Sequence, residues 1–349
     1  MSESPAGLQC PPSPSHYDCI VMAHGGGGRL MQQLLDDIIR PAFANEWLDQ
    51  RHDSAVLPVT QRCAFTTDSY VIHPLIFPGG DIGKLAVCGT LNDLAMAGAR
   101  PAYLSVGFIL EEGLPLATLR QIVHSMAVTA HQADVRIVTG DTKVVERGKA
   151  DGLYINTSGI GLLETERWLH PGSLRPGDAI LLNGDVGRHG IAVMAKRNQL
   201  AFEPPLESDC ADLSGLIHSL LTRGMPIHCL RDLTRGGLAT ALIELAGESG
   251  LAMELEEATI PVSAAVEGAC ELLGLDPLFV ANEGRFVLCL PEAHADDCLA
   301  LMRAHPLGAN ACRIGRIVAT PDRRVLLQTR LGTTRRLLLP SGEQLPRIC

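Results

Sequence analysis

The sequence contains 11 cysteines among 349 residues but has no pair at C-x-x-C spacing. The cysteines are scattered from Cys10 to Cys349, and several lie in apolar stretches, such as Cys88, Cys289 and Cys298. Zinc sites need paired ligand spacing, and small secreted domains show dense disulfide pairing. The pattern argues against both, and it favours buried free thiols in a reducing, cytoplasmic setting.

The sequence also lacks an excess of positive charge, a long apolar run and a secretion signal. Its 29 Lys and Arg against 39 Asp and Glu give a net charge of −10, which argues against a surface for nucleic acid or anionic membrane. No apolar stretch approaches the roughly 20 residues of a membrane-spanning helix. The segment Met1 to Tyr17 has neither the basic start nor the apolar centre of a signal peptide. We interpret residues 1–17 as a disordered extension.

What the chain does contain is an alternation of strand-like and helix-like segments. The expected strands are Arg62–Thr67, Tyr103–Leu110, Val135–Thr139, Leu153–Leu163, Ala179–Asn183, Pro226–Leu230, Phe286–Leu290, Arg313–Val318 and Arg324–Gln328. The expected helices are Ile82–Gly98, Leu116–Ala133, His189–Arg197, Cys210–Arg223, Gly236–Ser249, Ala264–Leu273 and Glu292–Ala304. This order predicts an α/β protein with a duplicated architecture.

The turn-rich stretch 171–178 separates the two series of segments. We therefore predict a first domain over residues 18–170, a second over 171–338, and a mobile tail over 339–349. At 349 residues the chain suits two cores better than one.

The tail ends in Pro346-Arg347-Ile348-Cys349, so a thiol stands at the tip of the chain. A thiol is the most nucleophilic side chain near neutral pH, and on a mobile arm it can carry a group from one place to another. The plain alternative is an idle, frayed terminus. A prenylation signal is excluded, because its cysteine stands three residues before the end.

Two glycine-rich segments are candidates for phosphate binding. His24-Gly25-Gly26-Gly27-Gly28 precedes a helix-like run, so its N–H groups can converge on an anion; a flexible hinge is an equal alternative. The segment 79–84, Gly-Gly-Asp-Ile-Gly-Lys, fails the pattern of a P-loop because Leu85 replaces the metal-binding Ser or Thr. There, an N-cap at Asp81 is the plain alternative.

Four aspartates follow β-like runs or stand in turns: Asp68, Asp93, Asp141 and Asp232. Magnesium is usually held by a few carboxylates together with substrate phosphates, so the set predicts a metal–nucleotide site, although each one alone is more often a cap or turn residue. Lys143, Arg231 and Arg235 lie near these aspartates in the sequence and can neutralise phosphate charge.

Glu283 lies between a short apolar segment and the strand expected from Phe286. Its carboxylate can act as a general base, but a solvated turn glutamate is the better interpretation of this residue alone. His189, flanked by Gly187-Arg188 and Gly190, is interpreted only as the start of a helix.

Taken together, the motifs resemble the HypE family of hydrogenase-maturation carbamoyl dehydratases, in the aminoimidazole-ribonucleotide-synthetase-like superfamily. The matching segments are His24–Gly28, Phe65–Tyr70, Gly89–Asp93, Thr139–Lys143, Arg231–Gly237, Asn282–Gly284 and Pro346–Cys349. The terminal segment is the specific part, since the aspartate motifs alone indicate only the superfamily. The chain departs from the family pattern at Gly26, where serine is common, at Leu233, and in its N-terminal extension.

The resemblance implies a two-domain fold, ATP and Mg²⁺ as cofactors, and a homodimer formed through the first domain. It implies that a carbamoyltransferase of the HypF type loads Cys349, that the S-carboxamide is dehydrated to a thiocyanate, and that a HypC–HypD complex receives the cyanide for a nickel–iron hydrogenase. Glu283 and Lys143 match positions proposed as bases. A cationic neighbour, Arg347 or one on the partner, is expected to activate the thiol.

The implied nucleotide and metal residues fall on the motifs already described. The implied nucleotide-binding residues are Gly25, Gly26, Gly27, Gly28, Lys84, Asn92, Arg231 and Arg235. The implied metal ligands are Asp68, Asp93, Asp141 and Asp232. Two alternatives stay open: another ATP-dependent enzyme of the superfamily, such as selenophosphate or aminoimidazole-ribonucleotide synthetase or thiamine-phosphate kinase, or a non-catalytic scaffold that docks a partner through its tail.

Overall fold

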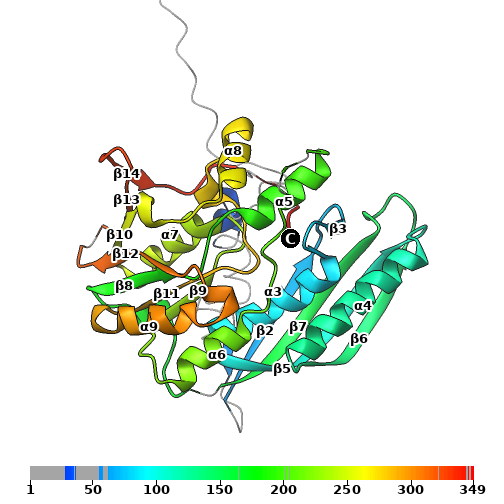
Figure 1. Ribbon diagram of the computed structural model, residues 1–349. Helices are drawn as coiled ribbons and strands as arrows, with labels where there is room; N and C mark the ends of the chain where they lie inside the picture. Colours follow the sequence, from blue (N-terminus) through cyan, green and yellow to red (C-terminus); the bar gives the residue numbers. More distant parts are fainter. Residues whose placement is uncertain are drawn as a thin grey trace, which may run out of the picture.

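Two α/β units lie side by side, and the C-terminus lies between them (Figure 1). The computed structural model describes residues 28–34, 36, 55–57 and 62–349, except residues 164, 201, 204, 321, 343, 344 and 346. The predicted extension 1–17 and the glycines Gly25, Gly26 and Gly27 lie outside the described residues.

The first unit is built on a five-stranded sheet in the order β1-β2-β7-β5-β6. Neighbouring strands are antiparallel except β5 and β6, which run parallel. Helices α3 and α4 cover one face of this sheet (Figure 1). The bounds are β1 Ala55–Leu57, β2 Cys63–Tyr70, β5 Ala99–Glu111, β6 Arg136–Val145, β7 Leu153–Leu163, α3 Ile82–Met96 and α4 Leu116–Gln132. Before them stands α1, Arg29–Leu34, and a two-stranded ribbon is formed by β3, Ile76–Phe77, and β4, Gly80–Asp81.

Helix α3 is the central element of the molecule, because almost every one of its residues is buried. The Asp81 carboxylate caps its N-terminus by accepting from the N–H groups of Gly83 and Lys84, so the plain alternative for this segment is confirmed. Gly89 allows the helix to approach strand β2, because a Cβ there would lie 2.2 Å from the Tyr70 hydroxyl. The helix also contacts α6 and β9 of the second unit, so it forms part of the junction between the units.

The second unit is built on a seven-stranded sheet in the order β14-β13-β10-β12-β8-β11-β9. Its pairs are antiparallel except β10 with β13. The strands are β8 Asp178–Leu182, β9 Cys229–Asp232, β10 Ala252–Glu256, β11 Phe286–Pro291, β12 Cys312–Val318, β13 Val325–Gln328 and β14 Thr334–Leu337. The helices are α5 Arg188–Arg197, α6 Ser214–Thr222, α7 Gly237–Ser249, α8 Ala264–Leu273 and α9 Ala295–Arg303.

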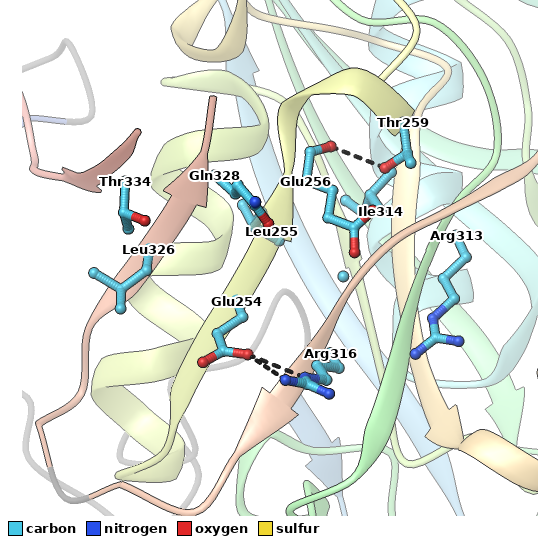
Figure 2. A pocket seen from close by; sticks show the side chains of 11 residues that line it. Glu254, Leu255, Glu256, Thr259, Arg313, Ile314, Arg316, Leu326, Gln328 and Thr334 are labelled. Atoms are coloured by element: carbon cyan, nitrogen blue, oxygen red, sulfur yellow. Dashed lines mark hydrogen bonds and ion pairs between the residues drawn. The ribbon is translucent and has the colours of Figure 1, made fainter. Parts of the chain in front are cut away.

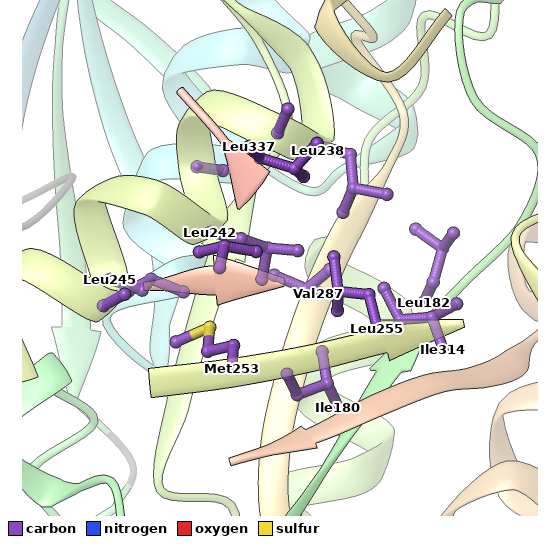
Figure 3. Close-up of a cluster of buried hydrophobic side chains, with 14 of the residues drawn as sticks. Ile180, Leu182, Leu238, Leu242, Leu245, Met253, Leu255, Val287, Ile314 and Leu337 are labelled. Carbon is purple, nitrogen blue, oxygen red and sulfur yellow. The ribbon is translucent and has the colours of Figure 1, made fainter. Parts of the chain in front are cut away.

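Helix α7 packs its apolar side on this sheet and forms the largest buried cluster (Figure 3). Leu238, Leu242 and Leu245 recur at spacings of three and four along α7, which places them on one side of the helix. They contact side chains from alternate positions of the strands, such as Met253 and Leu255 of β10. Helices α6 and α9 cover the other face of the sheet with a second cluster.

Most expected elements are confirmed, and β7 and α8 have the expected bounds. The helix expected from Cys210 begins only at Ser214, because residues 210–213 are held by contacts to the first unit. The strand expected from Pro226 begins at Cys229, and β10 was not expected at all. Strand β10 is only five residues long, and its sequence Ala-Met-Glu-Leu-Glu is as compatible with a helix as with a strand.

The cysteines behave as the scattered pattern predicted. None of the nine cysteines in the described part of the chain forms a disulfide, and seven of them are buried. Burial raises the pKa of Cys298 to about 12, and burial together with Asp276 raises that of Cys270 to about 11. These thiols are therefore protonated and inert near neutral pH. Among the described helices, none has the length and apolar character needed to cross a membrane.

Gly237 provides a test of how the second unit is packed. Its φ is +60°, and a Cβ would lie 2.5 Å from the Val280 carbonyl oxygen. We expect Gly237→Ala to lower the free energy of unfolding by about 1–3 kcal/mol, because it adds backbone strain and pushes against backbone. Gly247→Ala, in the same helix with nothing within 4 Å, is the control and should stabilise by about 0.5–1 kcal/mol. Denaturant unfolding measures both, and equal effects would contradict the close approach.

Candidate active site

The last three residues of the tail dock against both units. The N–H of Val71 donates to the Cys349 carbonyl at 3.1 Å, and the N–H of His73 donates to the Arg347 carbonyl at 3.4 Å. From the second unit, Arg197 donates to the Arg347 carbonyl at 2.7 Å. The Ile348 side chain is buried in the cluster formed around α3. No described residue of the tail lies in a helix or strand, and the tip is held by specific contacts.

Docking places Cys349 beside Arg235. The negative charge of Cys349 is the largest influence that raises the pKa of the Arg235 guanidinium, followed by Asp68, Glu283 and Asp93, while burial acts in the opposite direction. Arg347, the cation expected near the thiol, instead donates to the Val71 carbonyl and pairs with Asp151 at 2.5 Å. Within the described residues, Arg235 is therefore the better candidate for stabilising a thiolate at Cys349.

The first unit contributes Asp68 from β2 and Asp93 from α3. Burial raises the pKa of Asp68, and the Ser69 N–H and Arg235 oppose this shift. Thr66, two residues along β2 on the same side, donates to Asp93 at 2.9 Å. The two carboxylates therefore lie on adjacent elements, and their role as metal ligands stays a prediction.

The second unit contributes Asp232 at the end of β9 and Glu283 in the loop before β11. Glu283 is 3% exposed, so the solvated turn that was preferred for this residue alone is wrong. Burial raises its pKa well above the usual value, and Cys210, Asp232, Asp209 and Asp68 add to the shift in that order. Its Oε1 atom is buried and makes no hydrogen bond within the described structure. A protonated or poised carboxyl in such a place is suited to proton transfer.

Three predicted nucleotide-binding side chains are engaged by the protein itself. Asn92 donates to the carbonyls of Ala211 and Glu283 and accepts from the N–H of Leu213. Lys84 donates to the Gly79 carbonyl at 3.0 Å, and Arg231 pairs with Glu244 at 2.5 Å. A structural role is evident for each, and their nucleotide-binding role stays a prediction.

Other predicted residues are not brought to the Asp68 side of the sheet within one chain. Asp141 stands on β6, which β7 and β5 separate from β2, a distance of about 14 Å at ordinary strand spacing. The register places Asp141 in the row of Ser69, not in that of Asp68. Lys143 lies on the same strand and is exposed. Gly28 is buried against the tail, where the N–H of Arg29 donates to the Pro340 carbonyl.

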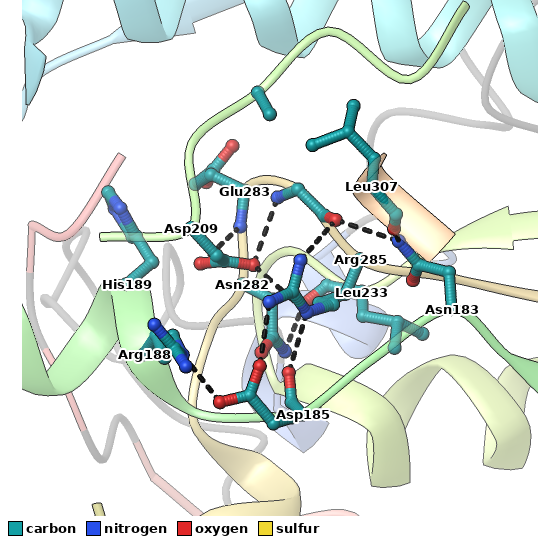
Figure 4. Close-up of polar contacts among 12 residues, drawn as sticks. Asn183, Asp185, Arg188, His189, Asp209, Leu233, Asn282, Glu283, Arg285 and Leu307 are labelled. Carbon is teal, nitrogen blue, oxygen red and sulfur yellow. Dashed lines mark hydrogen bonds and ion pairs between the residues drawn. The ribbon is translucent and has the colours of Figure 1, made fainter. Parts of the chain in front are cut away.

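A network of charged groups holds the loop that carries Glu283 (Figure 4). The sequence did not reveal this network. Asp209 accepts hydrogen bonds from the N–H groups of Glu283 and Gly284 at 3.3 and 3.1 Å. Arg285 bonds to Asp185 at 2.7 Å and lies 3.9 Å from Asp209. Burial alone would raise the pKa of Asp185, but hydrogen bonds from Arg188 and Arg285 lower it.

A cavity of about 700 Å³ lies elsewhere, on the open face of β10, β12 and β13 (Figure 2). Among its charged groups, Arg316 pairs with Glu254 at 2.8 Å, and Arg313 pairs with Glu292 outside the cavity lining. None of the predicted site residues lines it. The chemistry therefore belongs to the junction of the two units and not to this cavity.

The sequence was compared with known proteins. The models of the AIR synthase related protein N-terminal and C-terminal domains match residues 51–163 and 175–328. The carbamoyl dehydratase HypE of Azotobacter vinelandii is 52% identical over 331 residues, which cover 95% of this chain and 97% of that protein. The chain belongs to the HypE family of carbamoyl dehydratases.

Two solved HypE structures have the same fold. A HypE–HypF complex matches with a TM-score of 0.84 and 44% identity, over 88% of this chain and 99% of that chain. HypE in complex with ATP matches with a TM-score of 0.80 and 45% identity, over 95% of this chain and 100% of that chain. Both the resemblance and the predicted two-domain fold are therefore confirmed.

Glu283→Gln should separate catalysis from stability. An acid whose pKa is higher in the folded than in the unfolded state binds its proton more tightly when folded, so it makes stability fall as pH rises between the two values. For Glu283 this window opens near 4.5 and extends upward. We expect the variant to be more stable than wild type at pH 8 but not at pH 4, and to be inactive.

Denaturant unfolding at both pH values, without nucleotide, measures the difference. Glu112→Gln, an exposed glutamate of the same unit as Asp68, is the control and should follow wild type at both. A Glu283→Gln variant that is less stable than wild type at pH 8 would contradict the buried, uncompensated carboxyl.

Proposed function

We propose that the chain dehydrates an S-carboxamide on its own Cys349 to a thiocyanate, at the expense of ATP, and so supplies cyanide for the iron of a nickel–iron hydrogenase. The observation that carries this proposal is the docked tail: the charge of its terminal cysteine acts on Arg235, and Asp68, Glu283 and Asp93 act on the same guanidinium. A carrier thiol thus reaches the chain's own acid–base groups.

The chemistry has two steps. The amide oxygen of the S-carboxamide attacks the γ-phosphorus of ATP, and ADP leaves; this converts a poor leaving group into a good one. Loss of phosphate, with removal of both nitrogen protons, then leaves a C≡N group on sulfur. Glu283 is suited to accept one of these protons, because its pKa is raised by burial and by neighbouring carboxylates. Lys143 is the proposed second base.

Several carboxylates at one site fit the metal–nucleotide role. Asp68 is protonated more readily than usual because of its burial, so a cation beside it relieves that cost. Among the described residues, no three metal-ligating side chains form a protein-only site. This suits Mg²⁺, which is held by one or two carboxylates plus substrate phosphates, and which would neutralise the transferring charge. Asp68, Asp93 and Asp232 are the proposed ligands, with Asp141.

The tail must leave its docked position to be loaded, because the Cys349 carbonyl and the Ile348 side chain are held inside the protein. A carbamoyltransferase of the HypF type is the proposed donor, supported by the related HypE–HypF complex. A HypC–HypD complex is the proposed acceptor of the cyanide, and the cytoplasm is the proposed compartment.

The first test follows the mass of the intact protein. The chain is incubated with a HypF-type carbamoyltransferase, carbamoyl phosphate and ATP, and we expect a carbamoyl adduct on Cys349 and then the loss of one water from it. Loaded protein that is freed of nucleotide before it loses water should keep the adduct until ATP is added back. Cys349→Ala should form no adduct and should still bind ATP, because the nucleotide groups belong to the body of the protein. An active transferase that leaves Cys349 unmodified would refute the function.

We also propose a homodimer formed through the uncovered face of the first sheet. Helices α3 and α4 cover one face, and the other exposes large apolar side chains (Figure 1). They are Phe65, Tyr103, Ile109, Val138 and Ile160. An exposed apolar sheet face of this kind indicates a protein interface. Lys143 pairs in register with Ile109, so dimerisation would also decide what surrounds Lys143.

A charge at the centre of this face tests the dimer. Ile160 is 39% exposed on the middle strand β7, and we expect Ile160→Lys to give a monomer by light scattering on a sizing column. Val123→Lys, at 43% exposure on the opposite helix α4, should leave the oligomeric state unchanged. A dimer that persists in Ile160→Lys would exclude this face as the interface.

A further inference from the structure

The carbonyl groups of the last three residues are each held by a hydrogen bond from the body of the protein. Val71 holds the carbonyl of Cys349, and His73 and Arg197 hold that of Arg347. The carbonyl of Ile348, the residue before the reactive cysteine, is held at 2.9 Å by Nε2 of His189. The His189 hydrogen bond thus holds the residue directly before the reactive cysteine.

The protonation of His189 follows from its partners. A carbonyl oxygen only accepts, so Nε2 must carry a proton. The ring is fully buried, and burial lowers its pKa although the Ile348 carbonyl and Asp209 oppose this. The ring is thus neutral near pH 7, and Nδ1 accepts from the Ser208 hydroxyl at 2.8 Å. Ser208 in turn accepts from the Cys210 N–H at 3.0 Å. The donor of each hydrogen bond in the series from Cys210 to the Ile348 carbonyl is therefore defined.

The same short segment that orients His189 also holds the proposed base. Asp209, between Ser208 and Cys210, accepts from the N–H groups of Glu283 and Gly284. Gly284 approaches so closely that a Cβ there would lie 1.9 Å from the Asp209 carbonyl oxygen. Segment 208–210 thus contacts the tail through His189. It contacts the Glu283 loop directly through Asp209 (Figure 4).

We propose that His189 is a positioning residue for dehydration: its Nε2–H fixes the Ile348 carbonyl so that Cys349 is presented to Glu283 in one register. This inference rests on the proposed function, in which the tail carries the substrate. Loading takes place on the undocked tail and therefore does not need His189. The alternative is a purely structural histidine, since the ring also packs edge-on against Phe77 at 5.4 Å.

His189→Gln and His189→Asn form a matched pair of variants. The glutamine amide can donate from the position of Nε2, whereas asparagine is one methylene shorter and can satisfy Ser208 but not reach the Ile348 carbonyl. We expect His189→Asn to slow the single-turnover dehydration of preloaded protein about tenfold to a hundredfold, as loss of one buried hydrogen bond implies. His189→Gln should retain most of the wild-type rate.

Two further readouts separate positioning from folding. Loading of Cys349 by the carbamoyltransferase should be the same in wild type and both variants, within about twofold. Alkylation of Cys349 by iodoacetamide, followed by peptide mass mapping, should be faster in His189→Asn than in His189→Gln or wild type. Ser208→Ala, which removes the donor to Nδ1, should change dehydration and alkylation in the same direction as Asn.

Asn and Gln variants with equal dehydration rates, or loading that falls together with dehydration, would overturn the proposal. If wild type itself is loaded but never loses water with ATP, the proposed function fails. The alkylation rates then still decide the inference: faster labelling in Asn alone supports a tail contact made by His189, and equal labelling overturns it.

Discussion

The candidate site depends on one buried amide that joins the two units. Asn92, 2% exposed on α3, uses both its N–H donors and its oxygen on main-chain groups of the second unit. One of these is the carbonyl of Glu283, so the helix that carries Asp93 also holds the loop that carries Glu283. A buried amide without partners is costly, and one with three partners fixes a single arrangement of the chains it joins. The relative position of the carboxylates from the two units follows from this contact.

The second constraint is charge. Four carboxylates from the two units influence this site: those of Asp68, Asp93, Asp232 and Glu283. Arg235, next to the docked tail, is the described cation that faces them. Burial raises the pKa of both Asp68 and Glu283, and neighbouring acidic groups, Asp232 and Asp68 among them, add to the shift of Glu283. The site is thus prepared for a ligand that brings positive charge with it. A magnesium nucleotide meets this requirement better than free ATP, whose own charge is negative.

The sequence predicted the helices and strands better than the contacts that hold distant segments together. Strand β7 and helix α8 are correct because their apolar periods are undisturbed over the whole element. Helix α6 was extended too far toward Cys210, because local pattern cannot show that Asn92 and the Glu283 loop hold residues 211–213. For the same reason His189 was interpreted as a helix start. It does lie in the first turn of α5, but its hydrogen bonds to Ser208 and to the far end of the chain are revealed by no local pattern.

The free energy of the tail contacts is small enough for the tip both to dock and to leave. Its carbonyls and the Arg347 side chain make six hydrogen bonds to Val71, His73, His189 and Arg197. At a net value of about 1 kcal/mol each, these contribute about 6 kcal/mol, and burial of Ile348 adds about 2 kcal/mol. Ordering the last five residues costs about 7 kcal/mol. Because these terms nearly cancel, docked and undocked tails have similar free energies, as a carrier that visits two partners requires. A single contact such as that of His189 then has a large effect on how often the thiol meets Glu283.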